Sequence, residues 1–166
     1  MKTKKILAAA VIFIILFSSG CQDNKELKVL TMDDFEFTEL GEGENVIIPK
    51  GYIGFSVYGK DNELIIDRVF ANSDYKRKIS VADLSKDICR ELNIPFVFSG
   101  MGVLFYVEGI NALFERDHGP DSGWLYSVNG EYQGIGCATY ILKDGDYVEW
   151  HYTLELGRDF GLEFDQ

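Results

Sequence analysis

A single segment of this chain carries the apolar spacing of an amphipathic helix, and that segment limits the folds open to the rest. Ser80 can cap a helix start, and Asp83 in the first turn suits the positive end of the helix dipole. Apolar side chains then recur at helical spacing, at Val81, Leu84, Ile88 and Leu92. Asn93 and Pro95 predict the end of the helix. The apolar face of this helix has to be buried against another element, and strands are the available partners. We therefore expect an α+β fold with one helix on a mostly antiparallel sheet.

Short segments typical of strands lie on both sides of this helix. Residues 53–58 and 64–70, joined by turn residues at 59–62, predict a hairpin before it. After it we expect short strands at 96–98, 103–107, 124–128, 139–142 and 147–154. Asn129-Gly130 and Asp144-Gly145 predict tight turns, because these residue types tolerate positive φ. In the last strand the period of two places Val148, Trp150, Tyr152 and Leu154 on one face.

The N-terminus has the pattern of an export signal. Lys2, Lys4 and Lys5 precede an unbroken apolar run over residues 6–17, and small residues follow up to Cys21. Twelve apolar residues are too few for a helix to cross about 30 Å of hydrocarbon, so residues 1–20 are predicted to be a signal peptide. They hold three Lys and no acidic residue, so the mature chain would have 13 basic and 27 acidic side chains.

This segment also resembles a bacterial lipoprotein signal, which implies that Cys21 is the lipidated first residue of the mature protein. We therefore expect a protein anchored by lipid to the extracytoplasmic face of the cell membrane. A strongly acidic mature chain repels anionic lipid, so the anchor has to come from acyl chains, more than one of which is needed for stable attachment. Residues 21–50 are predicted to be an acidic tether with the first edge element, and residues 51–166 the folded domain.

Charge and composition exclude several classes of function. A formal charge of −11 disfavours nucleic acid, because phosphate contacts need clustered Lys and Arg. The chain has no hydrolase elbow, phosphate loop or zinc-protease motif, so we expect a protein that is not an enzyme. Cys89 and Cys137 lie among apolar residues, which favours two buried thiols, although an exported protein could also join them in a disulfide.

Polar residues are densest between Glu115 and Trp124. Asp117, His118 and Asp121 could supply oxygen and nitrogen ligands to a divalent ion. The same residues are typical of a turn, in which Asp and Ser bond to their own backbone and Gly and Pro set φ. Turn scaffolding is the favoured interpretation, with metal binding and contact with an organic ligand as alternatives.

Aromatic residues form a second group beside a Gly-rich loop. Trp124 and Tyr126 share one face of their strand, and Tyr132 follows the turn. Most such rings in a small β-rich domain belong to the core, but a ring face left open here would suit a planar apolar ligand or another protein. In that case Trp124, Tyr126 and Tyr132 would give stacking area and Asn129 a polar contact.

Several motifs between residues 102 and 161 resemble a bacterial domain family of unknown function that is related to the C-terminal domain of transcobalamin. They are Tyr106-Val-Glu-Gly-Ile-Asn111, Asp117-His-Gly-Pro120, Ser122-Gly-Trp-Leu-Tyr-Ser-Val-Asn-Gly130, Leu142-Lys-Asp-Gly-Asp146, Glu149-Trp-His-Tyr-Thr153 and Leu156-Gly-Arg-Asp159. The resemblance covers roughly residues 52–161 and implies a β-grasp-like fold. In transcobalamin the related domain closes over cobalamin together with a larger helical domain.

The resemblance and the signal together lead to one functional expectation and two alternatives. We expect a lipid-anchored extracytoplasmic ligand-binding module, with a corrinoid-like small molecule as the ligand that the resemblance implies. About 146 mature residues could cover one face of a corrin but not enclose it. The alternatives are a cell-surface module that binds an envelope protein and a protein that binds a divalent metal ion.

Overall fold

The computed structural model describes residues 25–34 and 47–163. Its strands are β1 (Val29–Thr31), β2 (Tyr52–Tyr58), β3 (Leu64–Asn72), β4 (Phe96–Ser99), β5 (Tyr106–Ile110), β6 (Leu113–Phe114), β7 (Gly123–Val128), β8 (Glu131–Tyr132) and β9 (Tyr147–Thr153). The α-helix is α1 (Val81–Glu91), and the 3₁₀ turns are η1 (Met32–Asp34), η2 (Lys60–Asn62), η3 (Gly102–Leu104) and η4 (Arg158–Phe160).

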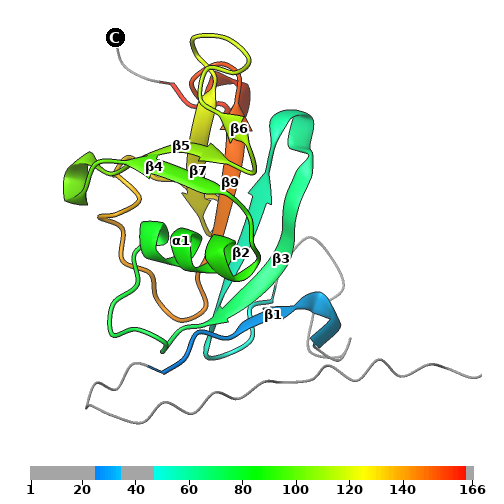
Figure 1. The fold of residues 1–166 in the computed structure, drawn as a ribbon, viewed down its shortest axis with the longest axis vertical. Helices are drawn as coiled ribbons and strands as arrows, with labels where there is room; N and C mark the ends of the chain where they lie inside the picture. Colours follow the sequence, from blue (N-terminus) through cyan, green and yellow to red (C-terminus); the bar gives the residue numbers. More distant parts are fainter. Residues whose placement is uncertain (1–24, 35–46, 164–166) are drawn as a thin grey trace, which may run out of the picture.

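Six strands form the main sheet, in the order β1-β3-β2-β9-β7-β8 (Figure 1). Four of its pairings are antiparallel, and β2 and β9 run parallel, with Phe55 opposite Val148 and Val57 opposite Trp150. A first hairpin, a helix and a last strand that returns beside the first form a β-grasp arrangement. The expected fold class, α+β with one helix on a mostly antiparallel sheet, is confirmed.

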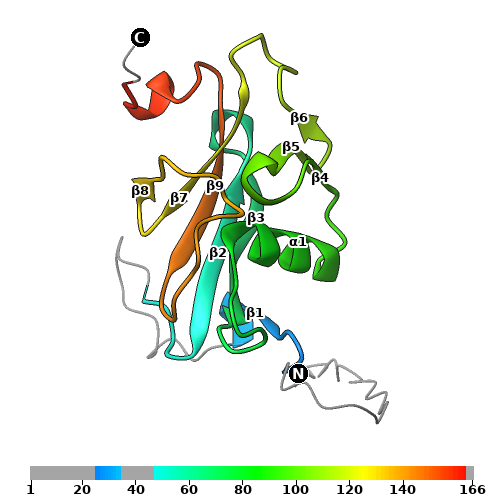
Figure 2. The same cartoon turned by 90° about the vertical axis from the view of Figure 1, so that its left-hand side faces the viewer.

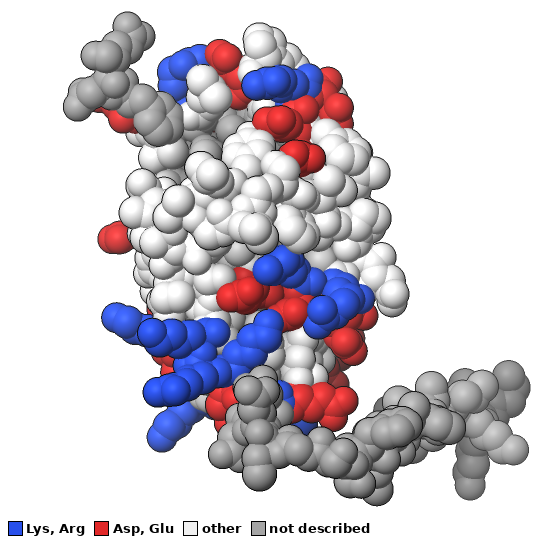
Figure 3. Space-filling model, turned by 60° about the vertical axis from the view of Figure 1, so that its left-hand side comes forward, with Lys and Arg blue, Asp and Glu red and all other residues white. Residues whose placement is uncertain are grey.

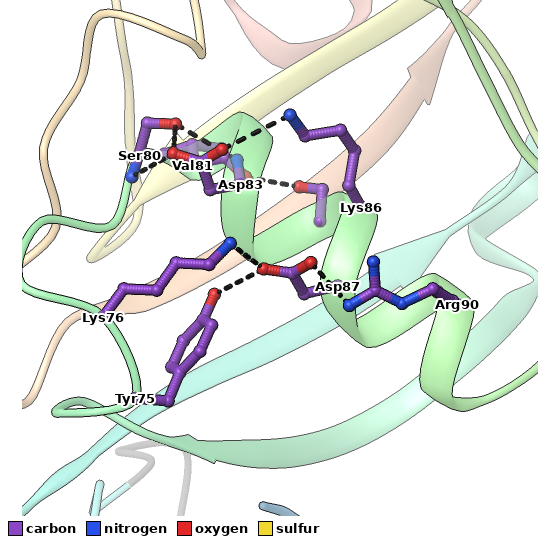
Figure 4. Close-up of polar contacts among 9 residues, drawn as sticks. Tyr75, Lys76, Ser80, Val81, Asp83, Lys86, Asp87 and Arg90 are labelled. Carbon is purple, nitrogen blue, oxygen red and sulfur yellow. Dashed lines mark hydrogen bonds and ion pairs between the residues drawn. The ribbon is translucent and has the colours of Figure 1, made fainter. Parts of the chain in front are cut away.

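The helix begins and faces the sheet as its sequence pattern predicts. Ser80 Oγ accepts a hydrogen bond from the Asp83 amide at 3.1 Å, and the Asp83 carboxylate accepts one from the Ser80 amide at 3.3 Å (Figure 4). This reciprocal pair satisfies two amides that a helix start leaves free. On the inner face the Trp150 indole Nε1 donates to Ser85 Oγ at 2.8 Å, which ties α1 to β9.

A buried carboxylate fixes the segment that leads into the helix. Asp87 is 5% exposed and accepts hydrogen bonds from Lys76, from Tyr75 Oη at 3.1 Å and from Arg90 Nη2 at 2.9 Å (Figure 4). A carboxylate removed from water needs such partners, so these contacts hold the crossover from β3 against the outer turn of α1.

Strands β4, β5 and β6 form a second, three-stranded sheet. Figure 2 shows these strands and α1 on the same side of the main sheet. The Trp124 indole Nε1 donates to the Leu113 carbonyl at 3.1 Å, and Val107 and Ile110 are buried. The second sheet therefore completes the layer that α1 begins and covers the β7 end of the main sheet.

Two of the expected strands need correction. The strand expected at 103–107 begins only at Tyr106, because Gly100 and Gly102 take positive φ of 70° and 55° and turn the chain into η3. No strand forms at 139–142, where Ile141 makes only an isolated bridge to Ser80. Two carbonyls of the segment 137–140 instead accept hydrogen bonds from the first amides of the helix. The Tyr140 carbonyl accepts from the Val81 amide, and the Cys137 carbonyl accepts from the Ala82 amide.

The N-terminal predictions fall largely on residues that the structure does not describe. The signal peptide at 1–20 and Cys21 lie outside the described residues. Within the range expected to contain the tether and first edge element, β1 pairs antiparallel with β3 at one edge of the sheet. No helix within residues 25–34 and 47–163 is long and apolar enough to span a bilayer.

Candidate functional site

The aromatic residues expected to offer ring faces lie in the core. Trp124 and Tyr126 share one face of β7 as predicted, and each is 8% exposed. The Tyr126 hydroxyl donates to the Ile135 carbonyl at 2.7 Å, and its ring lies 5.5 Å from that of Trp150. Both rings are therefore largely buried between the two layers, which is the interpretation that the sequence analysis favoured for such rings.

Asn129 and Tyr132 also have structural partners. Asn129, at φ 55°, donates from Nδ2 to Asp146 Oδ1 at 3.0 Å and accepts the Tyr147 amide at 2.9 Å. These bonds join the β7–β8 turn to the start of β9. The half-buried Tyr132 ring contacts the rings of His151 and Phe160 at 5.7 and 5.5 Å.

The three residues considered as metal ligands are engaged separately. Asp117 accepts a hydrogen bond from the Phe114 amide at 2.7 Å, and Asp121 forms an ion pair with Arg158 at 3.1 Å. The His118 ring meets the Tyr152 ring edge-on at 5.9 Å. Among the described residues no three His, Cys, Asp or Glu side chains are grouped so as to hold a metal ion. The loop has the geometry of the favoured interpretation, a turn scaffold.

Cys89 and Cys137 are free and buried, as the favoured interpretation had it. Burial raises the pKa of the Cys89 thiol to about 12 and that of Cys137 to about 11. Both thiols are therefore protonated at neutral pH, and a thiol in that form is a poor nucleophile and a poor metal ligand.

A groove that sequence analysis did not locate runs along the outer edge of β7. It consists of two adjoining cavities of about 370 and 210 Å³, and Tyr106, Trp124 and Leu125 line both. The larger one is bounded by Glu115, Arg116, Pro120, Ser122, Gly123, Thr153 and Leu156. The smaller one is bounded by Phe105, Val107, Tyr126, Tyr132, Gln133, Ile135, Gly136, Cys137, Trp150 and Leu162. Ligand sites in proteins are concave and mainly apolar in this way.

An exposed apolar turn, which we call the tip, stands beside this groove. It consists of Met101, Val103 and Leu104, whose side chains are 85%, 82% and 78% exposed. A Cβ at Gly100 would lie 2.1 Å from the Leu104 carbonyl oxygen, so the turn that presents them requires glycine. The chain then continues through Phe105 into Tyr106, and these residues line the groove.

The base of the tip is held firmly to the rest of the molecule. The Phe98 and Phe105 rings stack at 4.8 Å, and the Lys86 ammonium of α1 lies 5.7 and 5.4 Å from their centroids. The Tyr106 hydroxyl donates to Glu115 Oε2 at 2.6 Å. Figure 3 shows, on the side of the molecule that carries the β4–β5 loop, a broad band without charged side chains between two charged ends.

On the opposite face of β9 an aromatic cluster surrounds His151. Its ring stacks on Tyr58 at 5.1 Å and lies 5.3 Å from Phe160 of η4. His151 Nδ1 is buried and has no hydrogen-bond partner among the described residues. Burial lowers the pKa of this imidazole, because an apolar surrounding disfavours the charged form.

Comparisons with known proteins agree with the resemblance stated from the sequence. Residues 80–153 match the model of a family described as a domain of unknown function, DUF4430. No curated protein sequence matches this chain. The matched segment lies inside residues 52–161 and includes α1, the tip and the whole of β7.

Two solved structures are similar to this chain in fold. A Ruminococcus gnavus protein named as a candidate metal binding protein has a TM-score of 0.45 and 13% identity, covering 63% of this chain and 97% of its own. Haptocorrin in complex with Cbi has a TM-score of 0.49 and 17% identity, covering 69% of this chain; the chain spans only 27% of haptocorrin. With identities and TM-scores this low, neither likeness carries an argument about function.

The environment of His151 makes the stability of the fold depend on pH. Because the pKa of the folded imidazole lies below its ordinary value of 6.5, the unfolded chain binds more protons as the pH falls through that value. We expect the urea midpoint to decline between about pH 7 and pH 5 more steeply in the wild type than in His151→Gln. His118→Gln is the control and should keep the wild-type slope. Equal slopes in wild type and His151→Gln would contradict the assignment.

Proposed function

We propose that this chain is a binding module, not an enzyme, held by lipid on Cys21 at the extracytoplasmic face of the membrane, where it recognises a protein partner through the tip and the groove. The observation that carries the proposal is the exposure of Met101, Val103 and Leu104, at 85%, 82% and 78%, on a chain with a formal charge of −11. A contiguous apolar surface on such a protein is costly to keep in water and is typical of an interaction site.

The arrangement of the apolar surface favours a protein over a small planar molecule. Trp124 and Tyr126 line the groove but are each only 8% exposed, so they offer little ring area to a corrin. The tip is convex and is held by Phe98, Phe105 and Lys86, so it presents side chains outward and does not enclose a ligand. Exposed Met and Leu side chains beside a groove match the adaptable apolar contacts of protein interfaces.

A corrinoid-like ligand is the second candidate, and the half-exposed ring of Tyr106 favours it. This ring is 47% exposed and lines both cavities, so it offers an aromatic face where Trp124 does not. The combined groove is small for a whole corrinoid, which would therefore be covered on one side only. The resemblance stated from the sequence, to a family related to the C-terminal domain of transcobalamin, also implies this class of ligand.

The tip is expected to be needed for partner binding and not for folding. Replacing Met101, Val103 and Leu104 together by Ser should reduce cross-linking to a partner in intact cells at least about tenfold, because the apolar contact area is lost. The thermal unfolding midpoint should be unchanged, since the replaced side chains are exposed. Ile141→Ser with Leu64→Ser, which removes apolar side chains 47% and 48% exposed elsewhere, is the matched control. Equal cross-linking by both variants would refute the role of the tip.

Attachment through Cys21 predicts a specific result in fractionation. The wild type should sediment with membranes and become accessible to protease added outside the cytoplasm. Cys21→Ala should lose this attachment, because the proposed acyl chains are carried by Cys21. Cys137→Ala, which removes a buried thiol instead, should remain with the membranes. Wild-type protein recovered in the cytoplasm would contradict the proposal.

The corrinoid candidate can be tested by visible spectroscopy with cobinamide. Binding at the groove should shift the corrin absorption bands of cobinamide mixed with the wild type, and Tyr106→Ala should weaken the apparent affinity at least about tenfold, because an aromatic contact is lost. The Ile141→Ser variant should behave as wild type. An unchanged spectrum together with no calorimetric heat excludes this ligand and leaves the protein-binding proposal in place.

A further inference from the structure

One edge of the main sheet is left half open. Strand β9 pairs with β7 along its whole length, from Gly123 to Val128. On the other side β8 pairs only with the last two residues, Ser127 opposite Tyr132 and Val128 opposite Glu131. The chain then leaves the sheet, and on that side residues 123–126 of β7 are paired with no strand among the described residues.

The alternation of residues along β7 shows which backbone amides and carbonyls point away from β9. The Asn129 amide donates to the Tyr147 carbonyl at 2.8 Å, so odd-numbered residues of β7 direct their backbone groups toward β9. Because successive residues alternate in an antiparallel ladder, Trp124 and Tyr126 direct their amides and carbonyls outward. The pairing of Ser127 with Tyr132 brings Gln133 opposite Tyr126, so Trp124 is the residue whose outward backbone groups meet no paired strand among the described residues. An unpaired donor and acceptor on a sheet edge can accept an added strand.

The groove gives this edge the shape of a slot for one extended chain. Tyr106 of β5 lines both cavities, and two leucines of the C-terminal segment line one each, Leu156 the larger and Leu162 the smaller. At Gly123, which is buried, a Cβ would be in ordinary van der Waals contact with Glu115 and Tyr106, at 3.8 and 3.9 Å, so a longer side chain there would enter the slot. An added strand would direct alternate side chains to the two apolar walls.

We infer that the partner presents an extended peptide segment that pairs with β7 at Trp124, next to the point where the pairing of β7 with the β8 segment ends. This inference rests on the proposed protein-binding function and names the chemistry of the bound segment. The walls that flank the edge admit a single strand, whereas the edge of a second copy carries walls of its own. The segment is apolar where it meets the groove and basic at its ends, because the chain it approaches has a formal charge of −11.

The experiment uses the intact mature protein and synthetic peptides of about seven residues, the length of an ordinary strand. The first probe is acetyl-Lys-Val-Thr-Val-Thr-Val-Lys-amide, within a panel in which Val and Thr are exchanged for Ile, Leu, Phe or Tyr. Binding should slow hydrogen exchange at the amide of Trp124 at least about tenfold, because a new hydrogen bond protects it. The amide of Gly134, which lies in a loop, should keep its rate.

Two pairs of matched changes distinguish backbone pairing from nonspecific hydrophobic binding. Methylation of alternate backbone nitrogens on the peptide edge that faces β7 removes hydrogen-bond donors and blocks pairing, so it should weaken binding at least about tenfold. Methylation on the opposite edge of the peptide should leave the affinity unchanged. Gly123→Leu places a side chain in the slot and should weaken binding by a similar factor. Gly134→Leu is its control, because a side chain there meets nothing within 4 Å.

The outcomes distinguish this inference from the proposal on which it rests. If no peptide of the panel binds at millimolar concentration, or if the two methylated forms bind equally, the inference of strand addition is overturned. Loss of cross-linking in the tip variant would in that case still support the proposal of protein binding. Displacement of the peptide by cobinamide would show that a small molecule uses the slot instead. A dimer that buries the Trp124 amide without peptide would assign the edge to a second copy and overturn the inference.

Discussion

The parallel pairing of β2 with β9 is the constraint on which the rest of the fold depends. It joins the first hairpin of the domain to its last strand, so that residues 59–146 have to lie elsewhere than between these two strands. The pairing puts Trp150 at the centre of the sheet, where its indole donates to Ser85 of α1. One strand therefore closes the sheet and holds the helix, and the remaining elements take the positions that this pair leaves open.

Those positions explain where the tip and the groove lie. Because α1 covers only part of the inner face, the strands β4 to β6 cover the β7 end, with Trp124 bonded to Leu113 beneath them. The link from β4 to β5 cannot lie flat at Gly100 and Gly102, so it projects as the tip. The link from β8 to β9 gives its carbonyls to the start of α1, and β8 is consequently too short to cover β7. The tip and the groove are both results of how this second layer is connected.

Several features could be predicted because they depend on neighbours in the sequence. The helix follows from the spacing of Val81, Leu84 and Ile88, the cap from Ser80 and Asp83, and the turn from Asn129-Gly130. The period of two correctly placed Trp124 and Tyr126 on one face of β7. It could not say whether that face would meet solvent or another layer, because Leu113 lies in a different sheet. In the same way Asp117, His118 and Asp121 are close in sequence but have separate partners, and one of those partners, Arg158, lies near the C-terminus.

The amino-acid sequence by itself determined the helix, the turns, the alternation of the strands, the acidic charge and the resemblance to a transcobalamin-related domain family. These properties come from interactions within a few residues or from composition, and they do not require a particular tertiary arrangement. Only the tertiary structure decided which aromatic rings are buried, which stretch of β7 lacks a neighbour, and that the tip stands beside the groove. Burial and edge exposure depend on contacts between elements distant in the chain, and no local pattern contains them.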